Sequence, residues 1–199
     1  MTIKQFSLLV LCSLFSILVY SQNKYITRTG HINVQSSNRI VDIEADNYQV
    51  ISTINPQTGD IIFTGLLKSF EFQLGAADQV FNSKAVDVSA HPKMEFTGKI
   101  MDKSTINFTR PGRYNLKVSG VLTLWGEKRE TSANGTIVVT DNGTLEANSK
   151  FVMRLEEASV KRINQIMKQK LPSAISINTE TLGVSRNINV QLEMTYQSR

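Results

Sequence analysis

Apolar and polar side chains alternate with a period of two along much of this chain. The stretch 186–196 is the clearest example: five alternate positions are apolar, and the positions between them carry Asn, Gln, Glu or Thr. The stretches 114–124 and 144–155 follow the same rule. Because neighbouring side chains of a strand point to opposite faces, this pattern predicts strands with one buried and one solvated face, as in antiparallel sheets.

Shorter apolar runs fill much of the remaining chain, and turn-forming residues separate several of them. The runs are 32–35, 40–45, 48–54, 61–67, 94–101, 105–108 and 136–140. The turn signals are NPQTGD at 55–60, RPGR at 110–113 and DNG at 141–143. About ten short strands joined mostly by hairpins in one domain predict an all-β sandwich or closed barrel.

Two stretches depart from the strand pattern and predict helices. The first, 76–85, is short. The second, 159–171, has one apolar side and one polar side, and Pro172 ends it. Its apolar side consists of Val160, Ile163, Ile166, Met167 and Leu171, and its polar side includes Lys161, Arg162, Gln165 and Lys168. We interpret it as a helix packed on the sheet, with a membrane-facing helix or a mobile lid as the alternative.

The first 21 residues have the three-part pattern of a secretory signal peptide. Lys4 precedes a mostly apolar run, 6–20, and Ser21 ends a suitable cleavage motif before Gln22. The run is shorter than the roughly 18 apolar residues that a membrane-spanning helix needs. We therefore expect cleavage after Ser21, a mature domain at 22–199 and a periplasmic or secreted location. Cys12, the only cysteine, would be removed with the signal peptide.

The charge distribution excludes one class of partner. The formal net charge is +5, but the basic residues are scattered along the chain rather than clustered with aromatic residues. Nucleic-acid-binding proteins usually present a basic stripe, so we expect no nucleic-acid partner. The excess of positive charge favours at most a peripheral contact with an anionic membrane.

The search for catalytic or metal-binding motifs finds none. His31 and His91 have no serine or acid placed around them by a recognisable motif, and we interpret both as surface or hydrogen-bonded histidines. Asp42, Glu44 and Asp46 share one face of a predicted strand, which we interpret as its solvent side. The sequence therefore predicts a non-enzymatic protein without a catalytic or metal site.

The apolar faces of the strands remain as the candidate for function. The interior of an eight-stranded barrel is either just filled by side chains or holds one small ligand. Gly65, Gly98, Gly120 and Gly135 fall within strand patterns, where glycine leaves room or permits a close approach. A packed core would tend to fill such room. The candidate interior side chains are Phe63, Phe96, Leu116, Val118, Leu122, Phe151, Met153, Val190 and Leu192.

Four segments of the chain together carry a resemblance to a known family. They are YITRTGHINVQSS at 25–37, GDIIFTGLLKSFEF at 59–72, FNSKAVDVSAHPKMEFTGKI at 81–100 and YNLKVSGVLTLWGEKRE at 114–130. Together they resemble the YceI-like family of lipocalin-like, polyisoprenoid-binding bacterial proteins. The shared features include the Gly30-His31 pair, the Ser-Phe-Glu-Phe element ending at Phe72, and Phe81, Asn82, Pro92, Phe96 and Gly98. The resemblance spans essentially the whole chain after the signal peptide.

The chain departs from the family pattern in three places. Trp125 stands where the family commonly has a histidine, Ala85 and Val86 stand where an aromatic residue is often found, and the region 162–186 is longer than usual. The first two changes fall near positions that could meet a ligand, so they leave the identity of the ligand open.

The resemblance implies an antiparallel lipocalin-like β-barrel of about eight main strands with one or two short helices. Its interior would hold an isoprenoid or quinone-like lipid in the cell envelope, with no other cofactor, and a homodimer is left open. The alternative is a barrel with a side-chain-filled core that acts as an envelope interaction or stress-related protein. The expected ligand-binding residues are Phe63, Phe70, Phe72, Phe81, Phe96, Leu116, Val118, Leu122, Trp125, Phe151, Met153, Val190 and Leu192.

Overall fold

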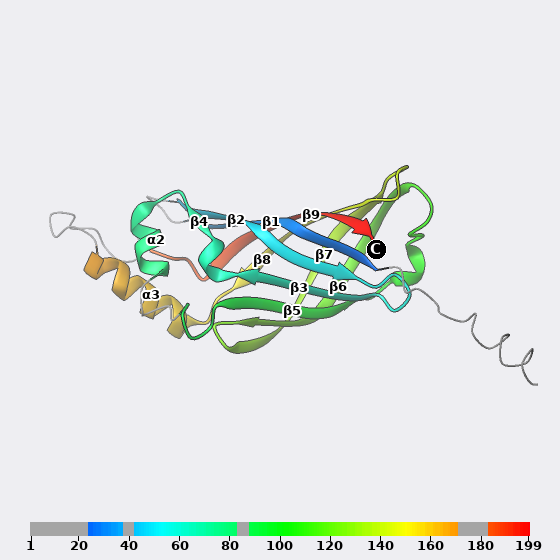
Figure 1. Ribbon diagram of the computed structural model, residues 1–199. Coiled ribbons are helices and arrows are strands. Elements are labelled where there is room, and N and C mark those ends of the chain that lie inside the picture. Colours follow the sequence, from blue (N-terminus) through cyan, green and yellow to red (C-terminus); the bar gives the residue numbers. More distant parts are fainter. Residues whose placement is uncertain (1–23, 38–41, 83–87, 171–182) are drawn as a thin grey trace, which may run out of the picture.

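The structure, a computed structural model, describes residues 24–37, 42–82, 88–170 and 183–199. The predicted signal peptide and its cleavage site lie outside these residues. The described chain forms a closed antiparallel barrel of eight strands, with one additional short strand and two α-helices (Figure 1). This architecture confirms the predicted lipocalin-like barrel.

The strands run around the barrel in the order β1-β9-β8-β7-β6-β5-β3-β2, and pairing of β2 with β1 closes it. The short strand β4 pairs with β2 through Ala45 and Phe72. The strands are β1 (Tyr25–Ser37), β2 (Asp42–Ile54), β3 (Asp60–Leu66), β4 (Glu71–Phe72), β5 (Lys93–Ile100), β6 (Gly112–Leu124), β7 (Glu127–Val139), β8 (Leu145–Arg154) and β9 (Asn187–Ser198).

The period-two pattern correctly identifies the inward face of these strands. In β9 the alternate apolar side chains from Ile188 to Tyr196 are buried or half-buried. The runs 40–45 and 48–54 prove to belong to one strand, β2, whose described part starts at Asp42. Asn47 connects them: it is buried, and its side-chain amide donates a hydrogen bond to the Leu66 carbonyl at 2.8 Å.

Two stretches of the chain differ from the prediction. The run 105–108 is not a strand: its first residue belongs to a 3₁₀ turn, η3 (Lys103–Thr105), and Ile106 and Phe108 are buried without strand pairing. Tyr25 stacks on Phe108 with ring centroids 6.1 Å apart and donates a hydrogen bond to its carbonyl at 3.1 Å. β7 starts at Glu127, well before the predicted 136. The alternation does not reveal its first half, because that half has polar or small residues on both faces.

The two helices lie at the same end of the barrel (Figure 1). α2 (Gly75–Phe81) buries Ala77 and Val80. α3 (Glu157–Lys170) buries Val160, Ile163 and Met167, while its predicted polar side is exposed. The prediction that this helix packs on the barrel is confirmed for the described residues. Leu171 and the residues 83–85 of the first predicted helix lie outside them.

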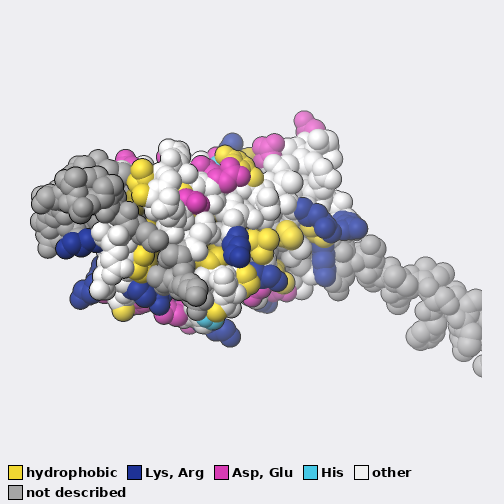
Figure 2. All heavy atoms as spheres, turned by 60° about the vertical axis from the view of Figure 1, so that its left-hand side comes forward, with side chains coloured by type: hydrophobic (Ala, Val, Ile, Leu, Met, Phe, Trp, Pro, Cys, Tyr) yellow, Lys and Arg dark blue, Asp and Glu magenta, His cyan; other side chains and the backbone are white. Residues whose placement is uncertain are grey.

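The surface agrees with the scattered distribution of charge. On the face shown in Figure 2, Lys and Arg side chains occur at several separate places and do not form one continuous stripe. Among the described residues, no helix is both long enough and apolar enough to span a membrane.

Candidate ligand-binding cavities

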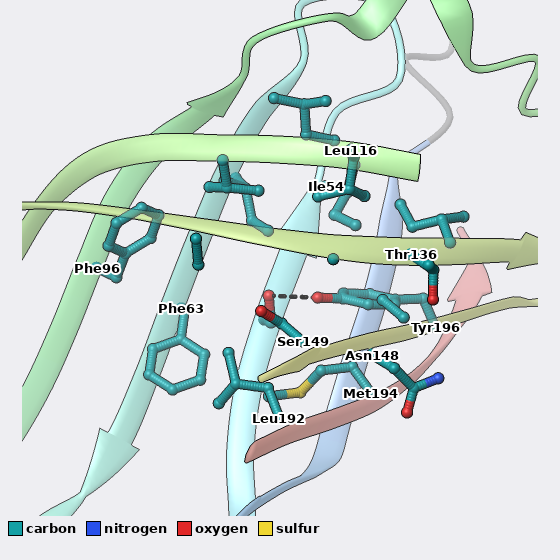
Figure 3. Close-up of a pocket in the computed structure, with 18 of the residues that line it drawn as sticks. Ile54, Phe63, Phe96, Leu116, Thr136, Asn148, Ser149, Leu192, Met194 and Tyr196 are labelled. Carbon is teal, nitrogen blue, oxygen red and sulfur yellow. Dashed lines mark hydrogen bonds between the residues drawn. The ribbon is translucent and has the colours of Figure 1, made fainter. Parts of the chain in front are cut away.

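The described residues line two cavities inside the barrel. The helix-end cavity has a volume of about 170 Å³ and is bounded in part by α2 and α3. The distal cavity has a volume of about 120 Å³ and lies further from the helices, among β2, β3 and β5 to β9 (Figure 3). Phe63 and Leu192 line both cavities, so these two side chains mark the boundary between them.

The lining of the helix-end cavity is almost entirely apolar. All strands except β7 contribute to it, together with both helices. Among the described residues that line it, Ser36 is the one with a hydroxyl group, and its oxygen accepts a hydrogen bond from the Ser185 N–H at 2.7 Å. A molecule in this cavity would therefore meet hydrocarbon and sulfur surface, which suits an apolar chain.

The distal cavity contains a buried pair of hydroxyl groups. Ser52 Oγ donates a hydrogen bond to the Ile62 carbonyl at 2.8 Å, so its other contact, at 2.9 Å, is a bond donated by the Tyr196 hydroxyl (Figure 3). Burial raises the pKa of Tyr196 to about 12. The pair is therefore neutral at physiological pH and places no charge in the cavity.

Every predicted ligand-binding residue lines one of the two cavities. That these residues contact a ligand stays a prediction. Phe63 and Leu192 line both, and Phe96, Leu116 and Val118 line the distal cavity. The remaining eight line the helix-end cavity: Phe70, Phe72, Phe81, Leu122, Trp125, Phe151, Met153 and Val190.

The sequence reasoning omitted lining residues from β1, β2 and the helices. Val34 and Ala45 alternate with polar neighbours, so the strand pattern could have identified them. Ile163 and Met167 lie on the predicted apolar side of the helix. What the sequence pattern does not contain is the position of α3 over the end of the barrel, which makes these two side chains part of the cavity.

Of the roles that the sequence left open for the strand glycines, close approach is the one found, because neighbouring atoms occupy the space beside them. The Phe96 ring lies over Gly98 and Gly120, where its Cζ would be 2.6 and 2.9 Å from an added Cβ. The Met94 side chain lies over Gly65 in the same way. Gly135 faces the Asn148 carbonyl oxygen on β8, 2.7 Å from the position of a Cβ. These glycines permit close approach and do not create cavity volume.

Trp125 occupies a strained position at the edge of the helix-end cavity. It and Gly126 form the two-residue turn between β6 and β7, with φ of 53° and 80°. Such hairpin turns favour Asn or Gly, and positive φ is uncommon for a bulky residue. The indole Nε1 is buried and has no hydrogen-bond partner among the described residues. Its N–H is therefore available to an acceptor on a bound molecule.

The histidines behave as the sequence suggested. His31 Nε2 lies 2.7 Å from Asp46 Oδ1, and its ring stacks on Tyr48 with centroids 4.4 Å apart on the outer surface. His91 is exposed. The acidic residues Asp42, Glu44 and Asp46 lie outside the barrel, and the described residues contain no group of side chains suited to a metal ion.

No protein-family model matches the chain, and no curated protein matches it significantly. Solved structures do. A polyisoprenoid binding domain from Saccharophagus degradans is 12% identical, with 88% of this chain and 98% of that chain covered and a TM-score of 0.71. Burkholderia cenocepacia BcnA is 14% identical, with coverages of 84% and 96% and a TM-score of 0.58.

A third structure, the Campylobacter jejuni YCEI protein, is 15% identical, with coverages of 87% and 85% and a TM-score of 0.46. At such identities the first two likenesses show a shared fold. The fold that the YceI-like resemblance implied is therefore confirmed.

Proposed function

We propose that this chain is a YceI-like protein of the bacterial cell envelope that holds an isoprenoid-like or similar amphiphilic lipid in its barrel and catalyses no reaction. The observation that carries the proposal is the apolar lining of the helix-end cavity. A hydrocarbon chain bound there gains about 25 cal/mol for each Å² removed from water, without directional contacts. The Saccharophagus degradans neighbour is described as polyisoprenoid binding, which supports the same class of ligand.

The size of the cavities indicates how a long chain would be accommodated. A volume of about 170 Å³ is close to that of an engineered cavity that holds a benzene-sized molecule. A longer chain would extend past Phe63 and Leu192 into the distal cavity. Met94, Met153 and Met194 line the two cavities, and unbranched methionine side chains readily change conformation to fit an irregular ligand.

The unpaired Trp125 N–H supports an amphiphile over a pure hydrocarbon. A buried donor without an acceptor costs free energy, and an oxygen on the ligand would remove that cost. Quinones and polyprenyl alcohols both carry such an oxygen at one end of an isoprenoid chain. The ligand would therefore lie with its polar end near the β6–β7 turn.

The proposed location rests on the sequence. The signal-peptide pattern at 1–21 supports export, followed by action in the periplasm or outside the cell. Sequestration or transport of an insoluble lipid suits a protein that leaves the cytoplasm. Intact-mass measurement of the exported protein tests this part. The mass of a chain that starts at Gln22 supports it, and the mass of a chain that still contains residues 1–21 contradicts it.

One observation favours the alternative, a barrel with a filled core. Phe96 and Met94 occupy the space over the strand glycines, so part of the interior is filled by the protein itself. On this reading the two cavities are packing defects, and the protein acts through its surface.

Extraction of the purified protein with organic solvent, followed by mass spectrometry, separates the two functions. A lipid in stoichiometric amount supports the binding function. Delipidated protein is then tested with a radiolabelled polyprenyl alcohol and a ubiquinone. Leu192→Trp fills the boundary between the cavities and should weaken binding at least tenfold, whereas Ile62→Trp, at a half-exposed outward position, should leave it unchanged. An empty extract and no saturable binding of either probe would overturn the proposal.

A further inference from the structure

The barrel wall is incomplete between β7 and β8. β7 pairs with β6 along its whole length, from Glu127 to Val139, and β8 pairs with β9 along its whole length. The ladder between β7 and β8, however, covers only Gly135–Val139 and Leu145–Ser149. Residues 127–134 of β7 and 150–154 of β8 therefore have no ladder partner across this boundary, which we call the seam.

Among the described residues, two side-chain hydrogen bonds cross from one strand to the other, one at the end of the ladder and one beyond it. Ser149 Oγ donates a hydrogen bond to the Asn134 carbonyl at 2.7 Å, directly beside the last ladder pair. Further along, Arg129 Nη1 donates to the Arg154 carbonyl at 3.0 Å. Arg129 pairs with Leu122 across β6, so it lies on the inward-facing side of β7. Its guanidinium also contacts Glu127 at 3.2 Å, while its buried Nε has no partner among the described residues.

Both cavities border the seam. On the β7 side, Thr131 and Ala133 line the distal cavity, and on the β8 side, Phe151 and Met153 line the helix-end cavity. All four are only partly buried. The lining of the distal cavity also includes Thr136 and Asn148. This ladder pair faces the outside of the sheet, because it alternates with the inward pair of Ile137, which is buried, and Ala147, which is partly buried.

Packed side chains lie at both ends of the described barrel. The described parts of α2 and α3 cover one end with buried apolar side chains, including Val80 and Met167. Near the other end, Tyr25 and Phe108 stack and are hydrogen-bonded. Passage of a chain through either end would displace these contacts. Passage through the seam beyond Ser149 would break the Arg129 hydrogen bond to the Arg154 carbonyl and leave every ladder intact.

We propose that the seam is a lateral portal through which an amphiphilic chain enters and leaves the barrel, with Arg129 as the side chain that closes it. This inference rests on the proposed lipid-binding function. Opening would release the guanidinium from the Arg154 carbonyl and expose the apolar edges formed by Phe151 and Met153. The unpaired Arg129 Nε–H would then be available to the oxygen of the ligand's polar end as the chain passes.

A reversible cross-link tests the portal. In a Cys12→Ser background, Ser132→Cys with Val152→Cys places one thiol on each side of the seam, since these two outward positions would be opposite each other if the ladder continued. The control combines the same Ser132→Cys with Ser119→Cys, its ladder partner on β6. In each folded double variant, the two cysteines are cross-linked with a short bis-methanethiosulfonate reagent. Exchange of a fluorescent polyprenyl alcohol is then followed by stopped flow.

The seam cross-link should slow both loading and release at least tenfold, leave the equilibrium affinity unchanged, and be reversed by reduction. The control cross-link should leave the rates unaltered. Arg129→Met keeps the stem but removes the bridge, and should speed exchange several-fold. If the seam cross-link leaves both rates unchanged while the probe still binds, the portal is overturned and the lipid-binding function stands. If the uncross-linked protein binds no probe, the proposed function fails and the portal fails with it.

Discussion

The ring of Phe96 on β5 lies over Gly120 on β6, where a Cβ on the glycine would be 2.9 Å from Cζ of the ring. Gly98, the ladder partner of Gly120, lies under the same ring. An aromatic side chain that covers paired glycines supplies the packing they lack and shields the backbone. The space over the two glycines, on the inner face of the barrel, is therefore filled by the Phe96 ring.

This relationship predicts an unequal response to two Gly→Ala substitutions. The Cβ of Gly120→Ala would overlap the Thr97 carbonyl oxygen and the Gly98 Cα, both backbone atoms that cannot move without shifting β5. We expect a loss of about 2–3 kcal/mol in the free energy of unfolding. In Gly65→Ala the nearest atoms belong to the flexible Met94 side chain, so the loss should stay below about 1 kcal/mol. Urea denaturation measures both, and equal losses would contradict the argument.

The sequence predicted the strands best where one face is apolar and the other is polar. β9 and β6 follow this rule, and the alternation indicates their inward residues, such as Val190 and Leu116. Only the first half of β7 is absent from the prediction, because its inward residues Arg129, Thr131 and Ala133 are polar or small, like their outward neighbours. A period-two pattern of apolar residues arises where one face of a strand packs against apolar side chains. The part of β7 that borders the seam lacks this pattern.

The candidate site was predicted less completely, for reasons of three-dimensional packing. Whether Phe96 fills the space over Gly120 depends on the register between β5 and β6, which no single stretch of sequence specifies. The boundary formed by Phe63 and Leu192 joins two strands that lie far apart in the chain. The strain at Trp125 follows from the two-residue turn, which the strand pattern alone does not reveal.

Two adjacent residues of β8 test which face of this strand is inside. Phe151→Asp would place a carboxylate in the helix-end cavity, where an unpaired charge costs several kcal/mol or prevents folding. Val152 is 59% exposed, so Val152→Asp should change stability by less than about 0.5 kcal/mol. Thermal unfolding followed by circular dichroism compares the two. A Phe151→Asp variant that melts like the wild type would show that the side chain can avoid the interior.

The buried Tyr196 predicts a loss of stability in alkali. Its pKa is raised to about 12 in the folded state, against about 10 when unfolded. The unfolded chain therefore loses this proton first as the pH rises, so the stabilisation is complete below pH 10 and is lost between about pH 10 and 12. A shift of about two units corresponds to about 3 kcal/mol.

Urea denaturation at pH 9 and 11 checks this prediction. The free energy of unfolding of Tyr196→Phe should fall less between pH 9 and pH 11 than that of the wild type. Tyr114→Phe is the control, because the Tyr114 hydroxyl is near the surface and donates to the Arg110 carbonyl. If both variants lose stability with the same slope as the wild type, the Tyr196 hydroxyl is not the group responsible.

Substitutions of Trp125 test whether the protein recognises the polar end group of the ligand as well as its hydrocarbon chain. As the only tryptophan, it should report binding directly: a quinone or polyprenyl alcohol added to delipidated protein should change its emission saturably. Trp125→Phe keeps an aromatic ring but removes the N–H, so affinity for either ligand should fall about 2- to 13-fold, the value of one hydrogen bond. Affinity for squalene, which has no acceptor, should fall much less. Trp125→His restores the residue that the YceI-like family commonly has and a potential donor, and should recover part of the loss. An equal loss for squalene and the alcohol would assign Trp125 to chain packing, with its N–H making no contact to the ligand.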